Sequence, residues 1–181
     1  MVYLVLEYCK GGDLGDFMSG GPVPETQARR LIRGVVQAVA QCHAKNILMR
    51  DVKPGNFMLL SRDLDSPVKA IDFGIAWYVR PGQRCTDRAG SPAYLAPEVV
   101  RESYGIESDL WSAGILAYRM LVGRQPFTGP YAEELASALG EDGKLRGTKE
   151  LFKAILYADL DFESEPWGEL VSRDGGGGVH E

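Results

Sequence analysis

Four polar side chains have the types and spacing that phosphoryl transfer requires. Asp51, Lys53 and Asn56 fall within the seven residues 50–56, and Asp72 follows sixteen residues later. Asp51 could accept the proton of an attacking hydroxyl, while Lys53 could neutralise charge on the transferred phosphoryl group. Asn56 and Asp72 could offer the hard oxygen ligands that Mg²⁺ prefers. These residues predict chemistry on a magnesium-bound phosphate.

The flanking sequence predicts which elements position these side chains. Apolar residues in 24–44 recur at the i, i+3, i+4, i+7 spacing of an amphipathic helix. Short extended stretches at 57–60 and 68–71, separated by a polar turn, predict a small hairpin. Residues 50–56 therefore fall in the loop between helix and hairpin, and Asp72 follows the second strand.

Further elements are predicted on both sides of this region. Residues 2–8 alternate in a way that suits a strand, and 149–158 suit a helix. Residues 108–122 predict a helix capped by Ser108 and fully buried, because it is apolar nearly all round. The long irregular segment 72–98 is a candidate for function, since unstructured loops above ~12–15 residues are uncommon otherwise.

Bulk composition excludes several classes of protein. The 181 residues fit one domain, and 45% hydrophobic with 25% charged residues is typical of a globular chain. The net charge of −5 argues against a nucleic-acid binder, and no apolar run approaches the ~18 residues of a membrane span. No secretory leader is recognised. Three scattered cysteines favour reduced thiols and a cytoplasmic location.

The order of the motifs resembles that of a protein kinase. Arg50-Asp51 with Lys53 and Asn56 resembles the catalytic loop of the serine/threonine class. Further matching motifs are Asp72-Phe73-Gly74, Gly90-Ser91-Pro92-Ala93-Tyr94, Ala96-Pro97-Glu98, and Asp109 with Trp111. The chain is therefore similar to eukaryotic protein serine/threonine kinases over most of its length.

This resemblance implies an α+β, protein-kinase-like fold. We expect mostly the helical large lobe, with the hinge strand and a small hairpin, and an N-terminal β lobe that is largely absent. Residues 1–170 would form the partial kinase domain, with a Gly-rich acidic insert at 129–148, and 171–181 a disordered Gly-rich tail. The sequence is expected to be truncated at both ends. No glycine-rich phosphate loop or strand lysine precedes the hinge, and the sequence stops soon after Trp167, before the final helices that the family has in the large lobe.

The resemblance also implies a role for individual residues. Asp51 would be the base, Lys53 and Ser91 would act beside it, and Asn56 and Asp72 would hold Mg²⁺. ATP would be bound by Leu6 as gatekeeper, Glu7 and Cys9 at adenine, Asp13 at the ribose, Met58 below adenine, and Ile71 beside it. The implied cofactors are ATP and Mg²⁺, and the implied partner is a protein substrate.

Regulatory and structural roles are implied for a second set. Arg50 would pair with a phosphate on Thr86, or instead with the fixed charge of Asp87. Phe73 and Gly74 would shape the magnesium motif, Asp109 would anchor the catalytic loop, and Glu98 would lack its usual arginine partner. Gly55 stands where the family commonly has Glu, which removes a contact for basic substrate residues.

Three segments resemble the calcium-dependent protein kinases of plants, algae and protists. They are residues 56–61, 69–74 and 161–167. The calcium-binding EF-hand loops of that family would lie downstream, and this sequence contains none. An alternative to an active kinase is a pseudokinase-like module that binds a protein partner. The intact Asp51, Lys53, Asn56 and Asp72 favour the kinase.

Overall fold

The computed structural model describes residues 1, 3, 5–63, 65–127, 148–158, 160, 162 and 167. The elements are α1 (Leu14–Phe17), α2 (Glu25–His43), β1 (Ile47–Leu48), η1 (Pro54–Asn56), β2 (Phe57–Leu59), β3 (Val68–Ala70), β4 (Trp77–Tyr78), η2 (Pro92–Tyr94), α3 (Pro97–Val100), α4 (Ser108–Val122) and α6 (Thr148–Tyr157). Helices dominate and the strands form two small sheets, as the predicted α+β class requires. The predicted insert, apart from Thr148, and the predicted tail lie outside the described residues.

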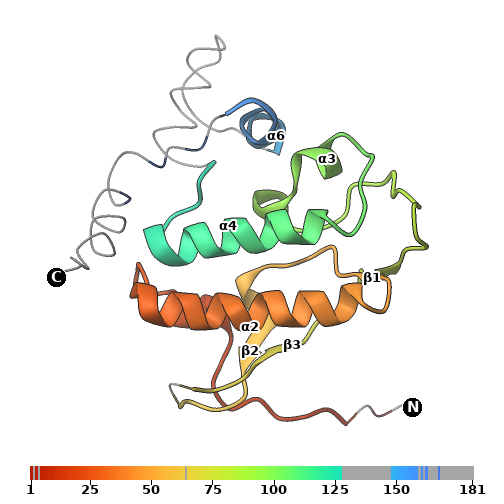
Figure 1. The fold of residues 1–181 in the computed structure, drawn as a ribbon. Helices are drawn as coiled ribbons and strands as arrows, with labels where there is room; N and C mark the ends of the chain where they lie inside the picture. Colours follow the sequence, from red (N-terminus) through yellow and green to blue (C-terminus); the bar gives the residue numbers. More distant parts are fainter. Residues whose placement is uncertain are drawn as a thin grey trace, which may run out of the picture.

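Two long helices, α2 and α4, form the centre of the molecule. They lie side by side, with the β2–β3 hairpin against the other side of α2 and with α3 and α6 beyond α4 (Figure 1). The predicted apolar stripe of α2 is buried at Ala28, Leu31, Val35 and Val39, although Val36 is exposed. The core therefore runs between the two helices and beneath the loop that joins α2 to the hairpin.

Two antiparallel pairs of strands bracket the candidate site. In the predicted hairpin, Phe57 pairs with Ala70 and Leu59 with Val68. In the second pair, Ile47 of β1 lies opposite Tyr78 of β4. The sequence did not predict β4, because it lies within the segment 72–98 that shows no periodicity. This pairing holds residues 72–76 next to the loop that follows β1.

Helix α4 differs from its prediction in two respects. Ser108 is the first helical residue and Glu107 is the N-cap, and the Ser108 hydroxyl donates to the carbonyl oxygen of Gly105 at 2.9 Å. The predicted capping role of Ser108 is therefore wrong. Full burial is also wrong, since Leu110 is 53% exposed. The apolar composition of α4 therefore did not predict that other elements pack against every side of the helix.

The predicted strand at 2–8 does not form in the residues described there. Tyr3, Val5, Leu6 and Tyr8 are exposed, and none of the described strands pairs with this segment. A strand is stabilised by the hydrogen bonds and cross-strand contacts of a neighbour, and alternation alone supplies neither. Among the described residues, no helix combines the length and apolar character needed to cross a membrane.

Candidate active site

The carboxylate of Asp51 is the centre of a compact polar cluster. Its Oδ1 accepts hydrogen bonds from the backbone N–H of Ser91 at 3.0 Å and from the Ser91 hydroxyl at 2.7 Å. Its Oδ2 accepts from Asn56 Nδ2 at 2.9 Å and forms an ion pair with Lys53 Nζ at 2.7 Å. Lys53 Nζ also donates to Ser91 Oγ at 3.0 Å. The structure thus brings together the three residues expected to act in catalysis and one expected metal ligand.

This cluster keeps Asp51 ionised. Burial of the carboxyl group acts to raise its pKa, but hydrogen bonds from Lys53, Ser91 and Asn56 and the charge of Lys53 outweigh burial, so the pKa lies below its ordinary value. A carboxylate stabilised in this way stays charged at neutral pH. It can therefore orient a hydroxyl group and accept its proton without first losing one.

The backbone that carries Asp51 is held by Asp109. This carboxylate is 1% exposed, and it accepts hydrogen bonds from the backbone N–H groups of Met49 at 2.8 Å and Arg50 at 2.9 Å. Arg50 has a φ of 68°, a left-handed conformation that costs of order 1–3 kcal/mol outside glycine. The bonds to Asp109 compensate for this strain, so the loop turns at the residue before Asp51.

His43 completes the same anchor. Its Nε2 lies 2.8 Å from Asp109 Oδ2, so the last residue of α2 contacts the first turn of α4. His43 continues the apolar stripe of α2 as the last residue of that helix. Its partner could not be found from that stripe.

Gly90 lets the segment before Ser91 pass very close to the catalytic loop. Its φ is 120°, and a β-carbon on it would lie 2.3 Å from the carbonyl oxygen of Arg50. Gly82 has a φ of 79° but no atom within 4 Å of such a β-carbon. A side chain would strain the backbone at both glycines, but only at Gly90 would it also clash with a neighbouring segment.

We expect Gly90→Ala to lower the free energy of unfolding more than Gly82→Ala. The strain common to both positions is about 1–2 kcal/mol, and only the first variant must also displace the loop that carries Asp51. Denaturant unfolding of both variants measures the difference. If both variants lost the same free energy of unfolding, the close approach of Gly90 to the catalytic loop would not contribute to stability.

The expected magnesium ligands have suitable oxygen atoms. Asn56 Nδ2 donates to the carbonyl oxygen and the carboxylate of Asp51, at 2.8 and 2.9 Å, which leaves the amide oxygen of Asn56 available. Asp72 is exposed, and its Oδ1 accepts from the N–H of Gly74 at 2.8 Å. Amide and carboxylate oxygens are the ligands that Mg²⁺ takes, so the residues fit the metal.

The residues expected at adenine are more open. Leu6 and Ile71 are 70% and 42% exposed, and Glu7 forms an ion pair with Lys69 at 3.1 Å. Cys9 and Met58 are partly buried. Asp13, expected at the ribose, forms an isolated bridge with Met58 and caps α1 by accepting from Asp16 N–H at 2.9 Å. The bridge between Asp13 and Met58 thus places the segment before α1 against the hairpin.

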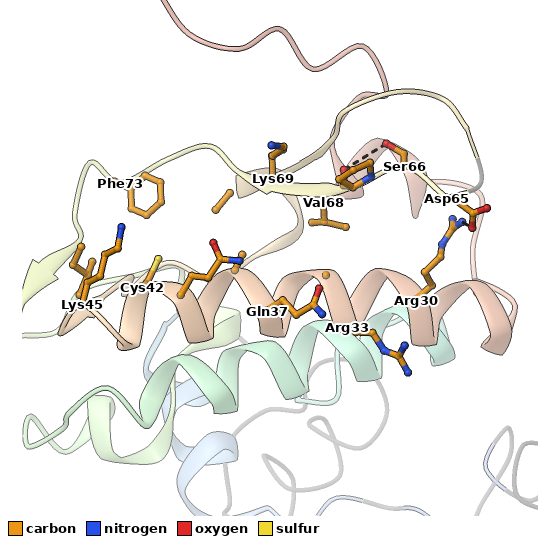
Figure 2. A pocket seen from close by; sticks show the side chains of 16 residues that line it. Arg30, Arg33, Gln37, Cys42, Lys45, Asp65, Ser66, Val68, Lys69 and Phe73 are labelled. Atoms are coloured by element: carbon orange, nitrogen blue, oxygen red, sulfur yellow. Dashed lines mark hydrogen bonds and ion pairs between the residues drawn. The ribbon is translucent and has the colours of Figure 1, made fainter.

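A pocket of about 670 Å³ lies behind this region, between α2 and the hairpin (Figure 2). Phe73 is at one end of it, near Lys45 and Cys42, and Arg30 and Asp65 are at the other. Phe73 is 48% exposed. The magnesium motif therefore reaches the pocket through Phe73, while its Asp72 carboxylate remains on the surface.

The two candidates for charge in the activation segment differ in position. Asp87 forms an ion pair with the guanidinium group of Arg50, whose side chain is only 7% exposed. That guanidinium group also lies 5.8 Å from the ring centre of Trp77, within the range of a cation–π contact. Thr86 is exposed and forms no hydrogen bond with Arg50. The structure thus pairs Arg50 with Asp87.

Glu98 is partly buried in α3 and has no ion-pair partner among the described residues.

A further contact that the sequence did not predict joins Tyr94 to α4. The hydroxyl of Tyr94 accepts from Arg119 Nη1 at 2.8 Å, and its carbonyl oxygen accepts from Ser112 Oγ at 2.7 Å. The sequence offers one indication of this contact, which is the arginine at position 119 within a largely apolar segment.

Comparison with known proteins agrees with this geometry. A family model described as Protein kinase domain matches residues 1–167. CDPK-related kinase 7 of Arabidopsis thaliana is 41% identical over 171 residues, which cover 93% of this chain and 27% of the relative. Calcium-dependent protein kinase SK5 of Glycine max is 44% identical over 170 residues, which cover 93% of this chain and 30% of the relative. The chain spans less than a third of the length of these curated relatives. By its motifs, its fold and these matches, the chain belongs to the protein kinase family.

Proposed function

We propose that this chain transfers the γ-phosphate of ATP to serine or threonine of a protein substrate. The observation that carries the proposal is the cluster of Lys53, Ser91 and Asn56 around an ionised Asp51, with contacts of 2.7–3.0 Å. When bound, Mg-ATP would supply the phosphoryl group and the charge that neutralises it, and Asn56 and Asp72 would hold the metal. The relatives that are named as kinases support the same reaction class.

The roles within the cluster follow from its hydrogen bonds. A carboxylate has about four lone-pair sites, and those of Asp51 accept from Ser91 twice, from Asn56 and from Lys53. Movement of Lys53 toward the transferred phosphoryl group would free a site on Oδ2. The substrate hydroxyl would then donate there, while Ser91 and Asn56 keep the carboxylate in place.

A second candidate is a binding module without catalysis. The exposure of Leu6, Ile71 and Phe73 favours it, because exposed apolar side chains mark partner sites where they form a contiguous patch. The name of the Glycine max relative attributes calcium dependence to that protein, and this sequence contains no EF-hand loop. Three free cysteines support the cytoplasm as the expected location.

One experiment separates the two candidates. The purified chain is incubated with Mg²⁺, ATP labelled on the γ-phosphate, and peptides that differ only in a central Ser, Thr or Tyr. Labelling of the Ser and Thr peptides is expected. Peptide binding without any labelling would contradict the transferase and favour the binding module.

The pairing of Arg50 predicts which activation-segment residue matters. We expect Asp87→Asn to lower phosphate transfer by about fivefold or less, because an ion pair with one exposed partner contributes roughly 1 kcal/mol or less. Thr86→Ala should leave the rate unchanged, since Thr86 is exposed and Arg50 pairs with Asp87 instead. Initial rates of peptide labelling measure both. A loss in Thr86→Ala without one in Asp87→Asn would contradict the role of Asp87.

A further inference from the structure

Among the described residues, Arg119 is a charged residue without an anionic partner, in the mostly apolar C-terminal half of α4. Its neighbours in α4, Tyr118 and Met120, are buried, whereas Arg119 is partly exposed. No carboxylate lies within ion-pair distance of it among the described residues, and its guanidinium group donates a hydrogen bond to the neutral hydroxyl of Tyr94. Placing an arginine here is unfavourable unless its charge meets a partner or water.

The guanidinium group has donors left over. Arginine carries five N–H donors, and only Nη1 of Arg119 has a hydrogen-bond partner among the described residues. The nitrogen atoms that are buried without a partner include Nε of Arg30 and of Arg50, but none of Arg119. The remaining donors of Arg119 therefore face accessible space and are free to bind an anion.

Tyr94 connects this arginine to the substrate side of the site. It is the last residue of η2, the short helix that begins directly after Ser91, whose hydroxyl is bonded to Asp51. Its backbone carbonyl oxygen is fixed by Ser112 and its hydroxyl by Arg119. Both hydrogen bonds orient Tyr94, so Arg119 is held in a defined position relative to the reacting hydroxyl.

The distance from Ser91 to Tyr94 suits contact between Arg119 and a substrate residue close to the phosphorylated one. Three residues of 3₁₀ helix rise by about 6 Å, and an extended substrate advances by about 3.3 Å per residue. Gly55, on the loop beside Asp51, is exposed, and no atom lies within 4 Å of where its side chain would begin. The site thus presents a cation at Arg119 and no anion at position 55.

We propose that Arg119 recognises an acidic side chain of the protein substrate, roughly two to four residues from the serine or threonine that is phosphorylated. Arginine suits this role, because its planar group binds a carboxylate through two parallel hydrogen bonds. The inference rests on the proposed function, since it takes residues 90–94 as the surface that faces the substrate.

The test measures binding separately from catalysis. Fluorescently labelled peptides with a central serine carry a single Asp at each flanking position in turn, and matched sets carry Lys or Ala. We expect an Asp at one or two positions to tighten binding to the chain by about tenfold over Ala, as measured by fluorescence anisotropy. Arg119→Glu should reverse this preference in favour of Lys at the same positions.

Two controls make the outcome specific. Arg101→Leu removes a different exposed arginine, at the end of α3, and should leave the ratio of Asp to Ala binding unchanged. Thermal unfolding shows that both variants fold. A wild-type chain that shows no Asp preference, or an Arg119→Glu variant that keeps it, would overturn the proposal. Preference without phosphate transfer would leave this inference standing and contradict the proposed function instead.

Discussion

Asp51→Asn should lower the rate of phosphate transfer by about 10²–10⁴-fold, the contribution of a positioned general base. The amide cannot accept the proton of the substrate hydroxyl. It also places an NH₂ group against donors, because both oxygens of Asp51 accept hydrogen bonds. Initial rates of labelling of a Ser peptide, at saturating ATP, measure the loss.

A matched substitution shows that the loss is specific to the site. Asp63 is an exposed carboxylate in the hairpin turn, where it accepts from Ser61 Oγ at 2.7 Å. Asp63→Asn makes the same chemical change away from the cluster, and its rate should match that of the unmodified chain. Circular dichroism confirms that both variants fold. Transfer that persists at more than a tenth of the original rate in Asp51→Asn would remove Asp51 from the role of base.

The elements that carry the site could be predicted where the pattern that identifies an element lies within one short segment of the sequence. The stripe of α2 and the two short extended stretches of the hairpin are local patterns, and the structure contains both elements within one residue or two of the expected ends. Asp51, Lys53 and Asn56 could be grouped for the same reason, since they share one turn of loop. The position of Ser91 followed only from the resemblance to kinases, because its hydrogen bond to Asp51 spans forty residues.

Contacts between distant segments explain what the sequence did not predict. The β1–β4 pair has only two residues in each strand, too few for any periodicity. The stacking of Arg50 on Trp77 depends on that pair, because Trp77 lies in β4. The contact of Arg119 with Tyr94 requires α4 to pack beneath η2, which is a property of the whole fold. These contacts could not be predicted because they depend on how distant segments pack, and not on the spacing of residues along the sequence.

The left-handed residue before Asp51 shows how the two kinds of information combine. The residue types at 50–56 predict the chemistry, but the backbone of Arg50 is strained, with a φ of 68°. It is stabilised by a carboxylate that lies fifty-nine residues later, at Asp109. The catalytic loop therefore takes its shape from α4, and the anchor should be among the most sensitive points of the fold.

Asp109→Asn is accordingly expected to destabilise the chain by about 3 kcal/mol or more, because a buried hydrogen bond to a charged group contributes ~1.5–3 kcal/mol and a buried donor left unpaired costs ~1–3 kcal/mol. Asp109 accepts from Met49 and Arg50 and contacts His43, all within 2.9 Å. An amide retains one acceptor oxygen, so at least one of these donors would meet an NH₂ group. The expected loss is a large part of the ~5–15 kcal/mol that stabilises a typical domain.

Urea unfolding followed by tryptophan fluorescence measures this loss. His43→Ala serves as the partial change, because it removes a single contact and leaves both backbone bonds to Asp109 in place. It should therefore cost less than Asp109→Asn, while Asp63→Asn should cost almost nothing. If Asp109→Asn lowered the free energy of unfolding by less than about 1 kcal/mol, the loop would hold its strained turn without this anchor. The large expected effect follows from geometry: one carboxylate ties the end of α2, the start of α4 and the backbone before Asp51 together, so its loss releases all three.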